Sequence, residues 1–190
     1  MAAAPNKKQL SKIQRQKATL RAMLWPGLDD KRLWNYTTTA GWLNVPRALP
    51  LILRIMDYMS KGKPLSSTYL DLWCRTYNDS FVVASKPREM AFYSGFSGER
   101  AERTWQSRMW ILAQLGFIDI KGGPNGDVSY ILIFNPFAVL KEHHEHGRVD
   151  ARSYNALLER MIETGGGNLS AEAGDDLDDI DLSNIEETPL

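Results

Sequence analysis

The chain has 190 residues, of which 43% are hydrophobic and 24% are charged, and its formal net charge is zero. A single cysteine excludes a disulfide framework and a cysteine-based zinc site, and six Trp, seven Tyr and six Phe exclude disorder throughout. No apolar run approaches the roughly 20 residues of a membrane span, and residues 1–5 lead into charged residues without the apolar stretch of a secretory signal, so we expect a cytoplasmic protein without a membrane partner.

The zero net charge hides an uneven distribution along the chain. Residues 1–164 carry all 23 basic residues and 15 of the 23 acidic ones, which is a net charge of +8. The last 26 residues carry eight acidic residues and none that is basic. A basic body with an acidic tail indicates a polyanion partner, although a soluble body with a solvating tail has the same pattern.

The first predicted element is a basic amphipathic helix over residues 6–24, within an arm of residues 1–25. Apolar residues recur at helical spacing from Leu10 to Leu24, basic residues such as Lys12 and Arg15 cover the other sides, and Trp25-Pro26-Gly27 ends the segment. We interpret it as an arm for a nucleic-acid backbone or as a short dimerisation helix. The alternative is a surface helix docked by its apolar stripe.

A turn-rich linker, residues 26–45, precedes two predicted helices. Its aromatic residues, Trp34, Tyr36 and Trp42, are expected to pack on the main domain. The first helix runs from about Pro46 to Ser60, and the second covers about residues 67–78. The expected buried stripe of the first contains Leu49, Ile52, Leu53, Met56 and Met59, and that of the second contains Leu70, Trp73, Cys74 and Tyr77.

The position of Cys74 on this apolar face predicts an inert core residue rather than a nucleophile. A short strand over residues 81–83 is expected next. A short helix over about 86–94 follows, with Ser85 as its N-cap, and it ends at Gly95.

The next segment predicts a tight turn, a longer helix and a hairpin. Ser97 is expected to cap a helix that runs to about Leu115 and is broken at Gly116. Residues 117–121 and 128–134 have strand-forming sequences, and the six residues between them include Asn-Gly, which is typical of a hairpin turn.

Short helix, tight turn, long helix and hairpin is an order that resembles a winged helix-turn-helix. Ala91 followed by Gly95 resembles the small residue and turn glycine of such motifs, and the passage from Arg108 to Ile118 resembles the step from recognition helix into wing. The Trp-Gln-Ser-Arg-Met and Leu-Gly-Phe-Ile segments are similar to small winged-helix proteins of bacterial plasmids and integrative elements, including replication initiators. The resemblance implies a mainly α fold with a small β-hairpin, formed by a domain of residues 46–162.

The resemblance also implies binding of double-stranded DNA by a nucleoid-associated protein, in replication initiation or equally in transcriptional regulation. A helical wheel of the long helix places Ala101, Trp105, Met109 and Leu112 on one side, with Leu115 near its edge. The opposite side carries groups that read bases in a major groove. The residues predicted to contact DNA are Arg100, Arg103, Gln106 and Ser107 on this face, Lys86, Arg88 and Ser97 before it, Lys121 and Asn125 in the hairpin, and Lys12 and Arg15 in the arm.

Two observations leave other interpretations open. The arginines lie beside Glu99 and Glu102, so the same face could be a solvated, ion-paired one. Trp110 also points away from the expected core, and the hairpin has one base, Lys121, near two acids. The alternative function is therefore a protein-interaction adaptor that docks partners through Trp110 and the acidic tail.

The only histidines of the chain, His143, His144 and His146, cluster in one short segment. His143 and His146 would share a helix face with Glu142, which allows a weak surface metal site. Gly147 instead indicates the polar last turn of a helix that begins near Pro136. Because no catalytic motif is present either, we expect no enzyme activity, no metal and no cofactor.

A last amphipathic helix over residues 149–162 is expected to pack within the domain or to form a homodimer. Its apolar residues are Val149, Tyr154, Leu157, Leu158, Met161 and Ile162. Residues 163–190 are predicted to be a disordered acidic tail. Leu177, Ile180, Leu182 and Ile185 alternate with its acids, so the tail could bind a protein partner, compete with nucleic acid for the basic body, or only add solubility.

Overall fold

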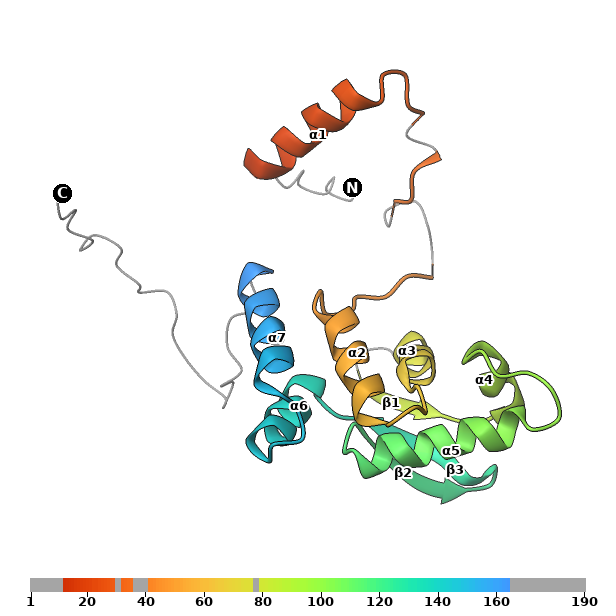
Figure 1. Ribbon diagram of the computed structural model, residues 1–190. Helices are drawn as coiled ribbons and strands as arrows, with labels where there is room; N and C mark the ends of the chain where they lie inside the picture. Colours follow the sequence, from red (N-terminus) through yellow and green to blue (C-terminus); the bar gives the residue numbers. More distant parts are fainter. Residues whose placement is uncertain (1–11, 30–31, 36–40, 77–78, 165–190) are drawn as a thin grey trace, which may run out of the picture. The chain divides into compact units, whose positions relative to one another are not determined.

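The computed structural model describes residues 12–29, 32–35, 41–76 and 79–164 (Figure 1). The chain separates into two compact units, Met1–Trp42 and Leu43–Leu190. In the described residues, seven helices accompany one three-stranded antiparallel sheet. None of the described helices has the length and apolar content needed to cross a membrane.

The described part of the first unit consists of one helix and parts of the following linker. Helix α1, Lys12–Leu24, ends at Trp25-Pro26-Gly27 as predicted, and its described apolar residues Leu20, Met23 and Leu24 are exposed. Trp34 and Trp42 are 70% and 45% exposed, and they belong to the first unit, so their expected packing on the main domain stays a prediction. Residues 6–11, the side chain of Lys12, and Tyr36 lie outside the described residues.

The second unit contains all the other elements. They are α2 (Leu49–Met59), α3 (Ser66–Arg75), β1 (Phe81–Val83), α4 (Pro87–Tyr93), α5 (Ala101–Gln114), β2 (Ile118–Gly123), β3 (Gly126–Ile133), α6 (Pro136–Glu145) and α7 (Ala151–Glu163). The predicted order of short helix, long helix and hairpin is therefore present, and the elements enclose a single core. The predicted acidic tail lies outside the described residues, apart from its first two.

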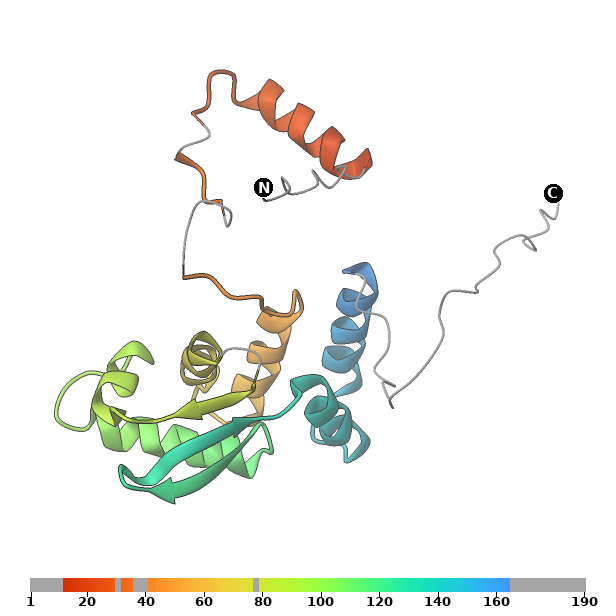
Figure 2. The same ribbon diagram turned by 180° about the vertical axis from the view of Figure 1, so that it is seen from behind.

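The sheet has the strand order β1-β3-β2, so the hairpin is joined to the strand that precedes α4 (Figure 2). Phe81 and Ile118 mark the starts of the outer strands and pair with Leu132 and Ile133 of β3. The strands continue to the pair Gly123–Gly126, so the turn is only Pro124-Asn125, and the six-residue loop predicted from the sequence was too long. A Cβ at Gly123 would lie 2.6 Å from the Tyr130 ring, which explains the glycine there.

Helix α2 confirms its predicted stripe, whereas α3 does not. Leu49, Ile52 and Met56 are buried, and Leu53 and Met59 pack against the core. On α3 the buried residues are Thr68, Tyr69 and Leu72, while Leu70 is exposed and Trp73 is only partly buried. Leu65, Tyr69 and Leu72 form a competing stripe, and it faces the core because the Tyr69 ring packs edge-on against Phe117, with ring centres 5.8 Å apart.

The prediction that Cys74 is a core residue was therefore wrong. The helix ends at Arg75, before Tyr77 could extend the expected stripe, and Tyr77 itself lies outside the described residues. The side chain of Cys74 is exposed as a free cysteine. Partial burial first, and then the charge of Asp71, raise the pKa of its thiol above the ordinary value, which lowers its reactivity.

Helices α6 and α7 complete the unit and contact α2. Asn135 caps α6 through Phe137, and Asp150 caps α7 by accepting the Ser153 amide hydrogen bond at 2.9 Å. Val149, Tyr154, Leu157 and Met161 are buried, which confirms packing within the unit. Ile162 was predicted on this stripe but is 73% exposed, because it lies one position beyond Met161 at the helix end.

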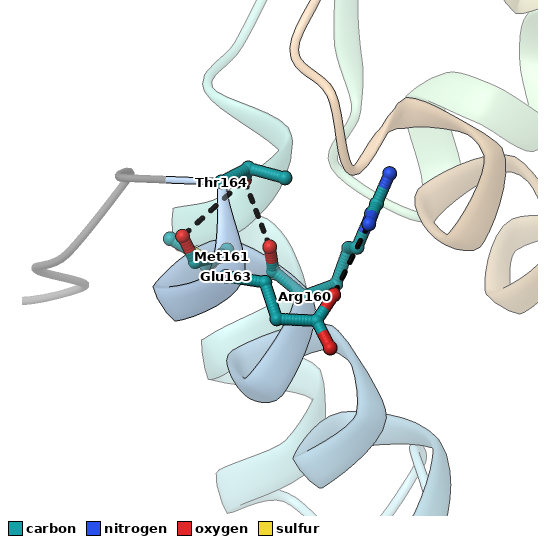
Figure 3. A network of polar contacts seen from close by, with 4 residues as sticks. All are labelled: Arg160, Met161, Glu163 and Thr164. Atoms are coloured by element: carbon teal, nitrogen blue, oxygen red, sulfur yellow. Dashed lines mark hydrogen bonds and ion pairs between the residues drawn. The ribbon is translucent and has the colours of Figure 1, made fainter. Parts of the chain in front are cut away.

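The last turn of α7 is closed by polar contacts (Figure 3). The Thr164 hydroxyl donates to the carbonyl oxygens of Arg160 and Met161, at 2.8 and 3.3 Å, and Arg160 forms an ion pair with Glu163 at 3.1 Å. The described part of the chain ends at Thr164.

Candidate nucleic-acid interface

Helix α5 is fixed by one buried face and by the glycine that ends it. Trp105, Met109 and Leu112 are fully buried, as the helical wheel predicts, and they anchor the helix against the core. At its end the Phe117 amide donates to the Leu112 carbonyl at 3.0 Å, and Gly116 takes a φ of 76° that few other residues adopt. The opposite face of the helix is therefore held toward solvent with little freedom to rotate.

The exposed face of α5 carries both arginines predicted to contact DNA. Arg100 is the N-cap residue, and Arg103 lies within the first turn; both are exposed, as is Ser107, while Gln106 is half-buried. Among the described residues, neither guanidinium makes an ion pair or a side-chain hydrogen bond. The ion-paired face with Glu99 and Glu102 that the sequence allowed is therefore absent from the described part of the chain.

Trp110 lies in the middle of this same face and is 45% exposed. Arg103, Ser107, Trp110 and Gln114 are all exposed and follow one another at spacings of four, three and four residues, which aligns them in one stripe. Gln114 is the residue that the sequence interpretation missed. The same helical spacing could have found it, because it continues the stripe beyond the positions that were considered.

The connection between α4 and α5 differs from the prediction. It spans residues 94–100 instead of a tight turn, and neither Ser85 nor Ser97 is a cap: the N-cap positions are Lys86 and Arg100, without side-chain capping bonds. Gly95 and Gly98 both have positive φ values, 88° and 82°, so the chain bends twice before the helix begins. Ser97 consequently lies exposed in this loop, ahead of the helix start.

Arg108 holds this loop in place. Its Nε donates to the carbonyl oxygen of Pro64 at 3.1 Å, and its guanidinium lies 5.9 Å from the centre of the Phe96 ring. Arg108 thus ties α5 to the α2–α3 connection and to the residues after α4. It has a structural role, unlike Arg103, although the two are basic residues of the same helix.

The remaining predicted contact residues are exposed but not equally available. Lys86 forms an ion pair with Glu89 at 2.9 Å, and Lys121 forms one with Asp119 at 3.2 Å. Arg88 is exposed and makes no ion pair with a described residue. Asn125 lies in the hairpin turn, where its backbone amide donates to the Ser129 hydroxyl at 3.1 Å.

The predicted arm residues belong to the other unit. Arg15 is exposed on α1, which belongs to the first unit, and the side chain of Lys12 lies outside the described residues. The structure therefore brings together the predicted residues of α5. Helix α4 and the β2–β3 hairpin belong to the same unit, where α4 and β2 contact α5.

The three histidines are bonded to backbone carbonyl groups. His143 is 5% exposed, and its Nε2 lies 2.7 Å from the Leu115 carbonyl oxygen at the end of α5. His144 Nδ1 lies 3.0 Å from the Val149 carbonyl and its ring stacks on Tyr154, and His146 Nδ1 lies 2.7 Å from the Glu142 carbonyl. Within the described ranges, no group of three or more His, Cys, Asp or Glu residues is placed to hold a metal ion.

No protein-family model, curated protein or solved structure matches this chain. Its function is accordingly inferred from the groups that its own fold exposes. The most distinctive of them are the unpaired guanidiniums, the amide and the hydroxyl of α5.

Proposed function

We propose that the chain binds double-stranded DNA by placing the exposed face of α5 in the major groove. The observation that carries this proposal is the pair of exposed guanidiniums, Arg100 and Arg103, which no described acid neutralises by direct contact. They stand beside Gln106 and Ser107 on a helix whose other side is buried. A rigid helix with free donors is suited to base readout, because an α-helix fits the major groove.

The side chains on this face have complementary partners on DNA. A guanidinium can donate two hydrogen bonds to guanine, and a glutamine amide can do the same with adenine. Arg88, exposed on the neighbouring helix, and Lys86 would contact phosphates and fix the orientation of α5 without reading sequence. The order of α4, α5 and the β2–β3 hairpin, which resembles a winged helix, supports this placement.

Salt-dependent anisotropy of a labelled duplex pool, titrated with the full chain between about 50 and about 200 mM salt, tests the proposal. Loss of a base contact in Arg103→Ala should weaken binding by about 1–3 kcal/mol, whereas Arg88→Ala should reduce the slope of log affinity against log salt by about 1. Arg160→Ala, which removes an exposed arginine from α7, is the matched control and should leave both unchanged. Absence of binding at the lowest salt, or equal losses in Arg103→Ala and the control, would overturn it.

The biological process that fits this activity is transcriptional regulation or the initiation of replication of a mobile element. Both require a protein that recognises a duplex site, and fold alone does not separate them. Sequencing of duplexes enriched on the full chain from a random pool would reveal one preferred site under either proposal.

Trp110 favours one alternative, docking of a protein partner. A half-exposed tryptophan in the centre of a helix face is a frequent anchor of protein interfaces. Trp110→Ala separates the two functions. Loss of partner capture with duplex affinity intact would support the adaptor, and loss of duplex affinity would place Trp110 in the DNA interface.

A further inference from the structure

Helices α2 and α7 border a groove that the proposed function does not use. The two helices are in contact and lie side by side in both views of the unit (Figures 1 and 2). The groove has a volume of about 510 Å³; its walls include Arg54 and Tyr58 of α2 and Arg152 and Ala156 of α7. A second hollow of about 760 Å³ shares Tyr58 and extends to Lys61 and Arg148.

The groove and the second hollow together are positively charged, because they are lined by four basic residues and only two acidic ones, Asp57 and Asp150. The oxygens of both acids already accept hydrogen bonds. Asp57 accepts the backbone amide hydrogen bonds of Leu65 and Ser66, at 2.6 and 2.9 Å, and Asp150 accepts those of the Ser153 amide and hydroxyl. The cations are not engaged in this way. Arg54, Lys61, Arg148 and Arg152 are exposed and make no ion pair with any described residue.

Apolar surface lies between these cations. Tyr58, which is 75% exposed, lines both hollows, and Leu51, Ile55 and Ala156 contribute to the walls of the groove. A phosphate backbone would use the cations and leave the apolar walls unfilled. A peptide in which acidic and apolar residues alternate would use both.

The chain itself contains such a peptide. Residues 175–185 include five aspartates, interleaved with Leu177, Ile180, Leu182 and Ile185, and no basic residue. Helix α1 of the first unit is basic and would be repelled by the groove, so it is not the occupant. We propose that residues 175–185 of the same chain bind in the α2–α7 groove, with their carboxylates on Arg54 and Arg152 and their apolar side chains beside Tyr58.

The length of the chain permits this return. The connection starts from Thr164, whose contacts close the last turn of α7 (Figure 3). From Thr164 back to Ser153, α7 rises by about 16 Å. The ten residues between Thr164 and Asp175 span up to about 33 Å when extended, so residues 175–185 can reach the groove.

The proposal is independent of the proposed DNA binding, because neither hollow includes a residue of the exposed face of α5. Paramagnetic relaxation in the full-length chain tests it. The exposed Cys74 is replaced in Cys74→Ser, and a nitroxide is attached through Ser183→Cys. Amides of residues 51–58 and 152–156 should lose more than half of their intensity, and they should recover in about 1 M salt, where the Debye length falls to about 3 Å.

Charge reversal identifies the contacts. The double variant Arg54→Glu, Arg152→Glu should abolish the loss of intensity, while the control Arg88→Glu, Arg103→Glu, which makes the same change of charge on α4 and α5, should retain it. The amide spectra of the same samples report whether each variant is folded. The proposal would be overturned if the groove amides kept their intensity. It would also be overturned if amides of α5 lost intensity instead and only the Arg88→Glu, Arg103→Glu variant restored it. Loss that appears only when labelled and isotope-enriched chains are mixed would also overturn it, because a second copy would then be the occupant.

Discussion

Replacing His143 by leucine should destabilise the second unit, because His143 provides the hydrogen-bond donor for the C-cap residue of α5. Its Nε2 lies 2.7 Å from the Leu115 carbonyl oxygen, and the imidazole is 5% exposed. Leucine fills much of the same space but cannot donate. A partly buried carbonyl at a helix end would then lack its partner.

The expected loss is about 1–3 kcal/mol, the usual cost of leaving a buried polar group unsatisfied. It lies toward the lower end of this range, because leucine also removes the buried Nδ1, which has no hydrogen-bond partner among the described residues. At about 2–4 °C per kcal/mol for a chain of this size, the Tm should fall by about 2–12 °C. Urea unfolding followed by tryptophan fluorescence would measure it. The matched control is His146→Leu, which is exposed and bonds only within its own helix, so its change should stay within about 0.5 kcal/mol.

Equal stability of His143→Leu and the wild-type chain would refute this account. So would a chelator that destabilises the wild-type chain as much as the substitution does, because the imidazole would then act as a metal ligand. A chelator without effect, together with a destabilised variant, would identify His143 as a structural donor.

Three other substitutions or treatments test separate parts of the structure. Gly95→Ala should cost about 1–2 kcal/mol in urea unfolding, because the left-handed φ of 88° opposes a side chain although the space around it is open; an unchanged midpoint would contradict this. Hydrogen bonds from Ser153 lower the pKa of Asp150 in the folded chain. The difference in unfolding free energy between the wild-type chain and Asp150→Ala should therefore be largest at neutral pH and should shrink as the pH falls through that lowered pKa. A difference that stays constant between pH 6 and about pH 2 would argue against the cap. Cys74 should be alkylated in the folded chain, and the rate should increase as the pH rises toward the raised pKa of its thiol. Alkylation that occurs only in denaturant would show that Cys74 is buried.

The sequence predicted α5 well because one strong local pattern determines it. Trp105, Met109 and Leu112 are large, correctly spaced and uninterrupted, so only one face could be buried. Gly116 then ended the helix at the expected place. The exposure of Arg100 and Arg103 followed from the same pattern.

Helix α3 could not be predicted in this way because two apolar stripes compete on it. Spacing alone treats Tyr69 and Trp73 as equal candidates. The choice depends on Phe117, which is 48 residues further along the chain and packs on Tyr69. Loop residues 94–100 escaped prediction for a related reason, since two glycines permit a longer path than the serine caps suggested.

The two proposals use separate surfaces, and electrostatics explains why both can hold in one chain. Body and tail carry +8 and −8, so a tail held against α5 would cancel the attraction of its arginines for phosphate. At physiological salt, charges more than about 8 Å apart are largely screened. A tail bound between α2 and α7 would instead be neutralised by Arg54 and Arg152 and would leave the exposed face of α5 unobstructed. Neutralising the tail aspartates should then change duplex affinity little, whereas a marked gain in affinity would place the tail on α5.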